Sequence, residues 1–187
     1  MITRNRIVAL LAVFASVCGG AMAADEYFVE VEAASMQFAR DGADLADRYE
    51  ARLEDGIAGL TAQYDLEDPA KIDALAAAAT GLGISTTVDL LTARAQSYGR
   101  FIDELESLSP PSEAAATHEA SLAALRDAVE SLPATIDAVR GLKDIGELAS
   151  AVAVSPFGVA RERLGAACRD LESIAADEAI DVDLRCP

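Results

Sequence analysis

Apolar residues recur at every third or fourth position along most of the chain, which is the spacing of the buried face of an amphipathic helix. The first series extends over residues 28–60 and predicts one long helix. Gly42, Gly56 and Gly59 weaken the interior of this helix, so we expect a kink near one of them.

A second helical pattern follows Asp68-Pro69, where aspartate suits the N-cap and proline suits the first helical position. We expect a short, alanine-rich helix that ends at Thr80-Gly81, with a break over Gly81–Gly83. The apolar spacing then resumes over residues 88–108 and predicts a further helix. Pro110-Pro111 must end this helix, because proline has no amide hydrogen and restricts the residue before it.

Three more helical segments are predicted in the C-terminal third of the chain. Ser112 is expected to cap a helix whose apolar series covers residues 118–139, and Pro133 should kink that helix. A short helix is expected over residues 145–152. Ser155-Pro156 then predicts the start of a final helix, again as an N-cap followed by proline.

Four main helical stretches joined by short connections predict an all-α fold, an up-and-down antiparallel helical bundle with kinks. The composition fits such a bundle: 52% of the residues are hydrophobic but only 5% are aromatic, and tryptophan is absent. The core is therefore expected to consist of closely packed small and aliphatic side chains. With 187 residues in all, we expect one helical domain over residues 24–187.

The first 23 residues have the pattern of a secretory signal peptide. Arg4 and Arg6 give a positive start, residues 7–17 form an apolar segment, and Ala21-Met22-Ala23 has the small residues of a cleavage site. We expect the mature chain to begin at Ala24. Cleavage would remove two arginines and no acidic residue, so the formal charge of −17 would become −19.

Cys18 leaves a second interpretation of this leader open, because it would carry a lipid anchor if the leader were that of a lipoprotein. Val17 is bulky where such a signal has a small residue, so we expect ordinary cleavage and no anchor. The apolar segment is shorter than the roughly 20 residues that span a membrane. We expect no transmembrane span in the mature chain and a secreted or periplasmic location.

Two cysteines, Cys168 and Cys186, remain after cleavage, in a compartment where disulfides persist. The tail after Asp177 can return along the last helix and bring Cys186 beside Cys168, so we expect a disulfide. The alternative is a pair of free thiols, because spacing alone does not establish connectivity.

The charge and the residue types exclude several classes of function. A strongly acidic chain repels nucleic acids and anionic membrane surfaces, and it favours cations or basic partners. With a single histidine and no Cys-x-x-Cys-His, the chain lacks the ligands of a zinc protease or a c-type haem. Gly81–Gly83 lacks the rest of a dinucleotide site, and no Gly-x-Ser-x-Gly occurs. We therefore expect no cofactor and no enzymatic activity.

His118 is expected to be partly buried, because it occupies an apolar position of its helix. One interpretation makes it a ligand or a pH-sensitive group beside Asp103, Glu106 or Glu119. The alternative is a packed histidine that bonds a carboxylate or a backbone carbonyl. A further possibility is an enzyme in which Glu106 and His118 act as an acid–base pair.

Two further candidate sites remain open. Asp44 and Asp47 lie on the first helix and offer oxygens to a metal ion, although interleaved arginines suit a solvated face equally well. Tyr49, Tyr98 and Phe101 are candidates for a groove between helices, unless they are ordinary core aromatics.

The segment Leu105-Glu106-Ser107-Leu108-Ser109-Pro110-Pro111, followed after six residues by His118, resembles a pattern of uncharacterised secreted or lipid-anchored helical proteins of bacteria. The ending resembles them too, with Ala167-Cys168-Arg169-Asp170-Leu171 and Val182-Asp183-Leu184-Arg185-Cys186. The resemblance implies an extracytoplasmic helical protein with a Cys168–Cys186 pair, and it implies no activity.

The leading hypothesis is therefore a non-enzymatic binding module outside the cytoplasm. Its partner would be an envelope or extracellular protein, or a small ligand. The alternatives are an acidic protein that binds a metal cation and, more remotely, an enzyme with a Glu/His pair.

Overall fold

The computed structural model describes residues 21–64 and 68–186. The positive and apolar parts of the predicted leader, together with Cys18, lie outside these residues. All the secondary structure in the described part is helical, so the all-α prediction is confirmed. The helices are α2 (Ala24–Gln63), α3 (Pro69–Glu106), α4 (Ser112–Arg140), the 3₁₀ helix η1 (Ile145–Glu147), α5 (Leu148–Ala153) and α6 (Pro156–Asp177).

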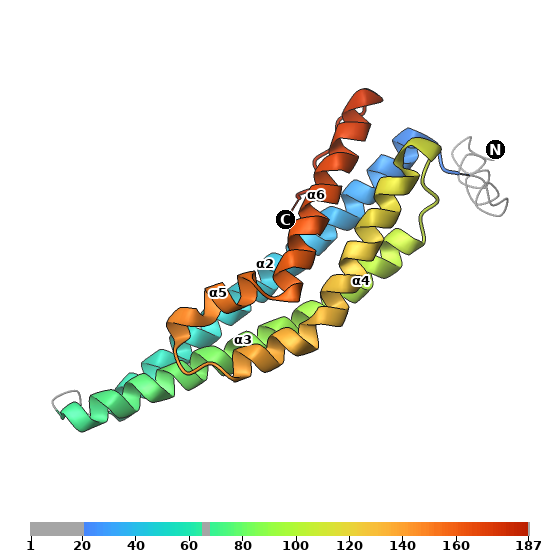
Figure 1. Cartoon of the computed structure of the whole chain (residues 1–187). Coiled ribbons are helices and arrows are strands. Elements are labelled where there is room, and N and C mark those ends of the chain that lie inside the picture. Colours follow the sequence, from blue (N-terminus) through green and yellow to red (C-terminus); the bar gives the residue numbers. More distant parts are fainter. Residues whose placement is uncertain (1–20, 65–67, 187) are drawn as a thin grey trace, which may run out of the picture.

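The four long helices run up and down, as the sequence predicts (Figure 1). Helix α3 returns along α2, α4 returns along α3, and α6 turns back along the first half of α4. The α2–α3 hairpin extends beyond the other helices, so only one end of the molecule is a four-helix bundle (Figure 1).

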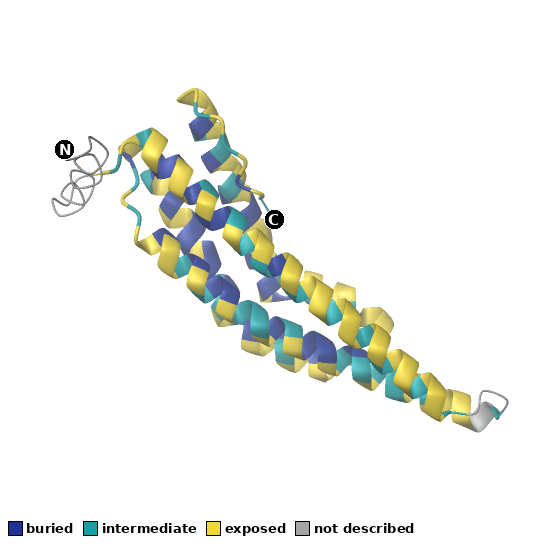
Figure 2. Cartoon of the chain, turned by 180° about the vertical axis from the view of Figure 1, so that it is seen from behind, coloured by how far each residue is buried: buried dark blue, intermediate teal, exposed yellow. Residues whose placement is uncertain are grey.

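Buried residues concentrate in that four-helix part (Figure 2). Large side chains with less than 2% exposure include Tyr27, Phe28, Leu125 and Leu132. The projecting hairpin is mostly exposed, and Ile57 and Ile72 retain 49% and 46% of their accessible surface there. The fold is therefore stabilised mainly at one end, where all four long helices contribute side chains.

Helix α3 is a single helix, so the predicted break over Gly81–Gly83 is wrong. Gly83 instead gives room for a close contact, because a Cβ atom at this position would lie 2.5 Å from Cδ1 of Ile145. Helix α2 likewise continues through its three interior glycines. At Gly56, a Cβ would lie 2.5 Å from a methyl of Leu82 on α3. These two glycines serve helix packing where sequence reasoning expects weak points.

The helix ends follow most of the expected signals. Helix α3 begins at Pro69, and α6 begins at Pro156 with the Ser155 hydroxyl accepting from the amide of Gly158 at 3.1 Å. The N-cap of α4 is Pro111 rather than Ser112, whose hydroxyl donates to Glu113 at 2.9 Å instead. Pro133 lies inside α4 without ending it, and the ribbon of α4 bends partway along its length (Figure 1).

Helix α3 is also long and apolar enough to cross a membrane by length and composition. The segment Lys71–Glu106 has a mean hydropathy of 1.4 over its most apolar stretch, and 28% of that stretch is buried. Much of the apolar character comes from an alanine-rich stretch on the projecting hairpin. Core helices of soluble proteins pass the same test, so the expected absence of a membrane span stays a prediction.

Candidate functional site

The C-terminal tail lies between α2 and α6 and closes that side of the bundle. The amide of Asp183 donates to Glu32 on α2 at 2.9 Å, and the amide of Leu184 donates to Glu172 on α6 at 3.0 Å. Cys168 and Cys186 form a disulfide with Cα atoms 5.6 Å apart, which confirms the predicted pairing.

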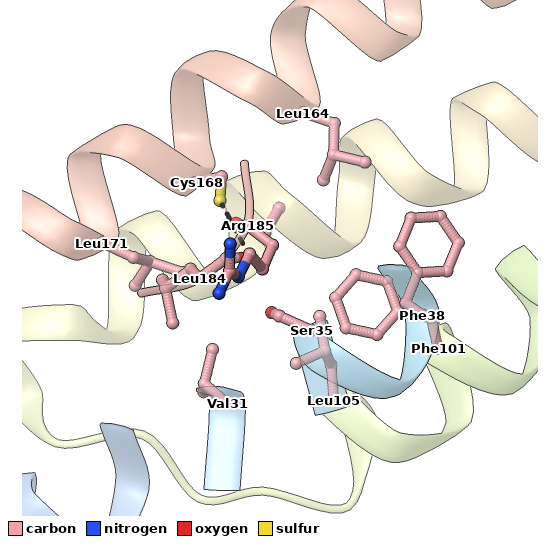
Figure 3. Close-up of a pocket in the computed structure, with 11 residues that line it drawn as sticks. Val31, Ser35, Phe38, Phe101, Leu105, Leu164, Cys168, Leu171, Leu184 and Arg185 are labelled. Carbon is pink, nitrogen blue, oxygen red and sulfur yellow. Dashed lines mark hydrogen bonds between the residues drawn. The ribbon is translucent and has the colours of Figure 1, made fainter. Parts of the chain in front are cut away.

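An apolar cavity lies beneath this tail (Figure 3). Leu184 covers it and is 2% exposed, while Phe38, Phe101 and Leu164 belong to its wall. Its volume is about 30 Å³, so it is a small packing void. Aliphatic and aromatic side chains dominate the wall, and the one charged residue on it is Arg185 of the tail. We interpret this cavity as part of the core that the tail seals.

His118 is buried among the helices, with 2% exposure, and its partner is a tyrosine. The Tyr27 hydroxyl lies 2.9 Å from Nδ1 of His118, and Tyr27 itself is fully buried. Burial lowers the pKa of His118, an effect that the nearby Glu119 carboxylate opposes, and burial raises the pKa of Tyr27. Both groups are therefore neutral at neutral pH.

Of the acidic residues expected beside His118, Glu119 acts on the charge of the imidazole from an exposed position. Glu106 pairs with Arg126 at 2.6 Å, and both Asp103 and Glu119 are exposed. The imidazole of His118 is thus buried while the Glu106 carboxylate lies at the surface in an ion pair with Arg126, and the Glu106/His118 acid–base pair stays a prediction.

The candidate metal ligands also remain apart. Asp44 and Asp47 are exposed on α2, and among the described residues no group of three or more His, Cys, Asp or Glu side chains is placed to hold a metal. Other charges on this face make ion pairs between helices. Asp41 pairs with Arg100, and Arg52 pairs with Asp89.

The three aromatic residues proposed for a groove are divided between two places. Phe101 stacks on Phe38 with ring centres 4.7 Å apart, and Tyr98 meets the same ring edge-on at 5.0 Å. Tyr49 lies further along the hairpin, where its hydroxyl is 3.2 Å from Oγ1 of Thr87. Tyr98 and Phe101 thus belong to one aromatic cluster, and Tyr49 lines a separate, shallow hollow on the surface.

A pocket beside Tyr98 is the best candidate for a functional site. It has a volume of about 210 Å³, below the about 300–1,000 Å³ typical of sites for drug-sized ligands, so it has room only for a small molecule. Side chains of four helices line it: Phe38 from α2, Thr87, Leu90, Leu91, Arg94 and Tyr98 from α3, Val152 from α5, and Phe157 and Arg161 from α6. The ring of Phe157 meets Tyr98 edge-on at 5.8 Å.

Arg94 enters this pocket half-buried and is held by the backbone of α2. Its Nη2 donates to the carbonyl of Gly42 at 3.4 Å, and a Cβ atom at Gly42 would lie only 2.6 Å from Nη1. Gly42 therefore leaves the space that the guanidinium occupies. Burial lowers the pKa of Arg94, and the neighbouring Arg161 lowers it further.

The hydroxyl of Tyr98 is close to both arginines. Burial raises its pKa, and the charges of Arg161 and Arg94, together with a hydrogen bond from Arg161, oppose that rise. Sequence reasoning identifies Tyr98 as a candidate but misses both arginines, because α6 is far from α3 in sequence and no spacing rule connects them. Comparisons with protein-family models, with curated proteins and with solved structures give no match.

Proposed function

We propose that this chain is a non-enzymatic binding protein that works outside the cytoplasm and holds a small ligand in the pocket beside Tyr98. The observation that carries the proposal is the pocket itself, which four helices share and whose aromatic walls surround convergent polar groups. A ligand there would bridge α5 and α6 to the α2–α3 hairpin.

The location outside the cytoplasm is supported by two features. The leader pattern of residues 1–23 is that of a cleaved signal peptide, and the Cys168–Cys186 disulfide suits an oxidising compartment. A binding role is favoured over catalysis because His118, the only imidazole of the chain, is enclosed with Tyr27 away from this pocket.

Native mass spectrometry of the protein purified from its own producing cells tests the proposal. We expect a bound small molecule on the native protein. Val152→Trp fills the pocket from α5 and should remove the bound mass, whereas Val159→Trp, at a residue of α6 that is 48% exposed and does not line the pocket, should retain it.

Two results would contradict this proposal: a native chain without any ligand, or a ligand that remains bound after Val152→Trp. Denaturing spectra of the same sample report the first residue and the loss of two hydrogens on disulfide formation. A start at Ala24 would support the proposed export, and a retained leader would contradict it.

A further inference from the structure

The charge of the Tyr98 pocket is opposite to that of the chain. The sequence has 32 acidic and 15 basic residues, yet the charged side chains that line this pocket are Arg94 and Arg161, without any Asp or Glu. Neither arginine forms an ion pair with a described carboxylate, although six other arginines do. Those pairs are Arg52–Asp89, Arg100–Asp41, Arg126–Glu106, Arg140–Asp137, Arg163–Asp127 and Arg185–Asp183.

We propose that the Tyr98 pocket binds a singly charged, carboxylate-like anion that carries an apolar group. The anionic head would lie between Arg94 and Arg161, within reach of the Tyr98 hydroxyl, and the apolar group would pack against Phe38, Val152 and Phe157. This inference rests on the proposed function and specifies the class of its ligand.

The first argument is the cost of the arrangement without a ligand. Arg94 is half-buried and Arg161 is exposed, so water screens their mutual repulsion on the side of Arg161 and burial strengthens it only in part. Burial also removes part of the hydration of Arg94, and its hydrogen bond to the carbonyl of Gly42 is long at 3.4 Å. An anion between the two guanidinium groups would remove the repulsion and supply charged acceptors for their donors.

The second argument concerns what the rest of the molecule excludes. With a formal charge of −17, the protein repels multiply charged anions before they reach the pocket. A single negative charge meets less of this repulsion. The aromatic and aliphatic part of the wall favours a ligand with an apolar group, because a small inorganic anion would make no contact with Phe38, Val152 and Phe157.

The third argument is that Arg94 is positioned for this site. Its guanidinium passes α2 at Gly42, where a Cβ atom would lie 2.6 Å from Nη1. An arginine that served only solubility would extend into water, where it keeps its hydration and its rotamer freedom. Arg94 instead keeps its charged end at the wall of the pocket.

The test compares three probes that share a chain and differ in head group: octanoate, octan-1-ol and octylammonium. The full mature chain is first freed of small molecules by dialysis, and native mass spectra verify that it is free. Isothermal titration should show that octanoate binds at least about tenfold more tightly than octan-1-ol, with no detectable binding of octylammonium.

Substitutions locate the head group in the pocket. Arg94→Gln and Arg161→Gln should each weaken octanoate binding about tenfold or more and leave the weak binding of octan-1-ol unchanged. Arg169→Gln is the matched control, because Arg169 is exposed on the same helix as Arg161 and does not line the pocket. Urea unfolding of every variant verifies that the fold is retained.

Equal binding of octanoate and octan-1-ol, or unchanged octanoate binding in both pocket variants, would overturn the anion proposal while leaving the pocket as a ligand site. Failure of all three probes to bind would also overturn it. The proposed function is judged separately, by the mass of the native ligand and its loss in Val152→Trp.

Discussion

At the scale of single residues, the Tyr27–His118 hydrogen bond is the clearest polar feature of the core. Its two members belong to the first turn of α2 and to α4, and both lie in a region from which water is excluded. A buried polar group without a partner costs more than its hydrogen bond contributes. The pair therefore fixes the start of α2 against α4 more specifically than apolar contacts do.

Tyr27→Phe should lower the free energy of unfolding by about 1–3 kcal/mol, because it leaves Nδ1 of His118 buried without its partner. Tyr49→Phe is the control. It removes a hydroxyl at a half-buried position, where the Thr87 hydroxyl still donates to the carbonyl of Gly83. Urea titration of both variants measures the difference, and equal effects would contradict the structural role of the Tyr27–His118 bond.

His118 should also make stability depend on pH. Burial lowers its pKa below the usual 6.5, so the unfolded chain takes up a proton more readily than the folded one. The contribution of His118 to stability is complete above about pH 6.5 and is lost as the pH falls from there towards the lower folded-state value. Its slope is at most about 1.4 kcal/mol per pH unit.

The many carboxylates change stability over the same pH range, so the comparison requires a variant. The difference in unfolding free energy between the native protein and His118→Gln should shrink as the pH is lowered from 7.5 to 5.5. A difference that stays constant over this range would contradict a depressed pKa at His118.

Sequence reasoning reaches only part of this residue-scale description. The apolar series that contains His118 predicts a partly buried side chain, and the structure buries it almost completely. The pattern does not identify Tyr27 as the partner, because the two residues are 91 positions apart and any neighbouring donor or acceptor would satisfy the imidazole. The carboxylates of Asp103, Glu106 and Glu119 are nearer in sequence, yet all three are exposed to water, and Glu106 pairs with Arg126.

At the scale of elements, α3 shows how tertiary packing overrides a local signal. Gly81 and Gly83 each disfavour a helix, but contacts with α2 and η1 hold this stretch in helical form. Pro133 also disfavours a helix, yet α4 continues through it. The helix starts at Pro69 and Pro156 are predicted correctly because they depend on the residues of a single turn, whereas continuity depends on neighbours distant in sequence.

Gly81→Ala tests the continuity of α3. A Cβ atom at Gly81 would meet nothing within 4 Å, so alanine adds helix propensity without a clash. We expect the free energy of unfolding to rise by about 0.5–1 kcal/mol, measured by urea titration. Gly83→Ala is the contrasting variant and should not stabilise, because its Cβ would meet Ile145. Destabilisation by Gly81→Ala would favour the break that the sequence suggests.

At the scale of the whole molecule, the bundle depends on its tail. Beyond the projecting hairpin, the four long helices enclose the core at the other end, and residues 183–186 complete that enclosure (Figures 1 and 3). The sequence predicts the disulfide because only two cysteines follow the leader. It does not predict that the tail lies against α2 as well as α6.

The Tyr98 pocket, too, can be predicted from the sequence only in part. Tyr98 is identifiable as an aromatic residue of the helix seam, but a pocket needs the relative placement of four helices. Arg94 and Arg161 come together only through the turn from α5 into α6. The spacing of apolar residues does not determine the angle of this turn, so only the folded structure shows that the site is positively charged.

Removal of the disulfide should show how much the tail contributes. Replacing both Cys168 and Cys186 by serine frees a tail closed by a bond between residues 18 positions apart, and should lower the free energy of unfolding by about 3 kcal/mol in the chain-entropy model. Urea titration measures the loss. Reductant should destabilise the native protein by a similar amount and leave the double variant unchanged, which separates the disulfide from any effect of the serines. If neither change lowered stability, the contacts of Leu184 and of the amides with Glu32 and Glu172 would hold the tail without the covalent bond, and the disulfide would not be what keeps the cavity closed.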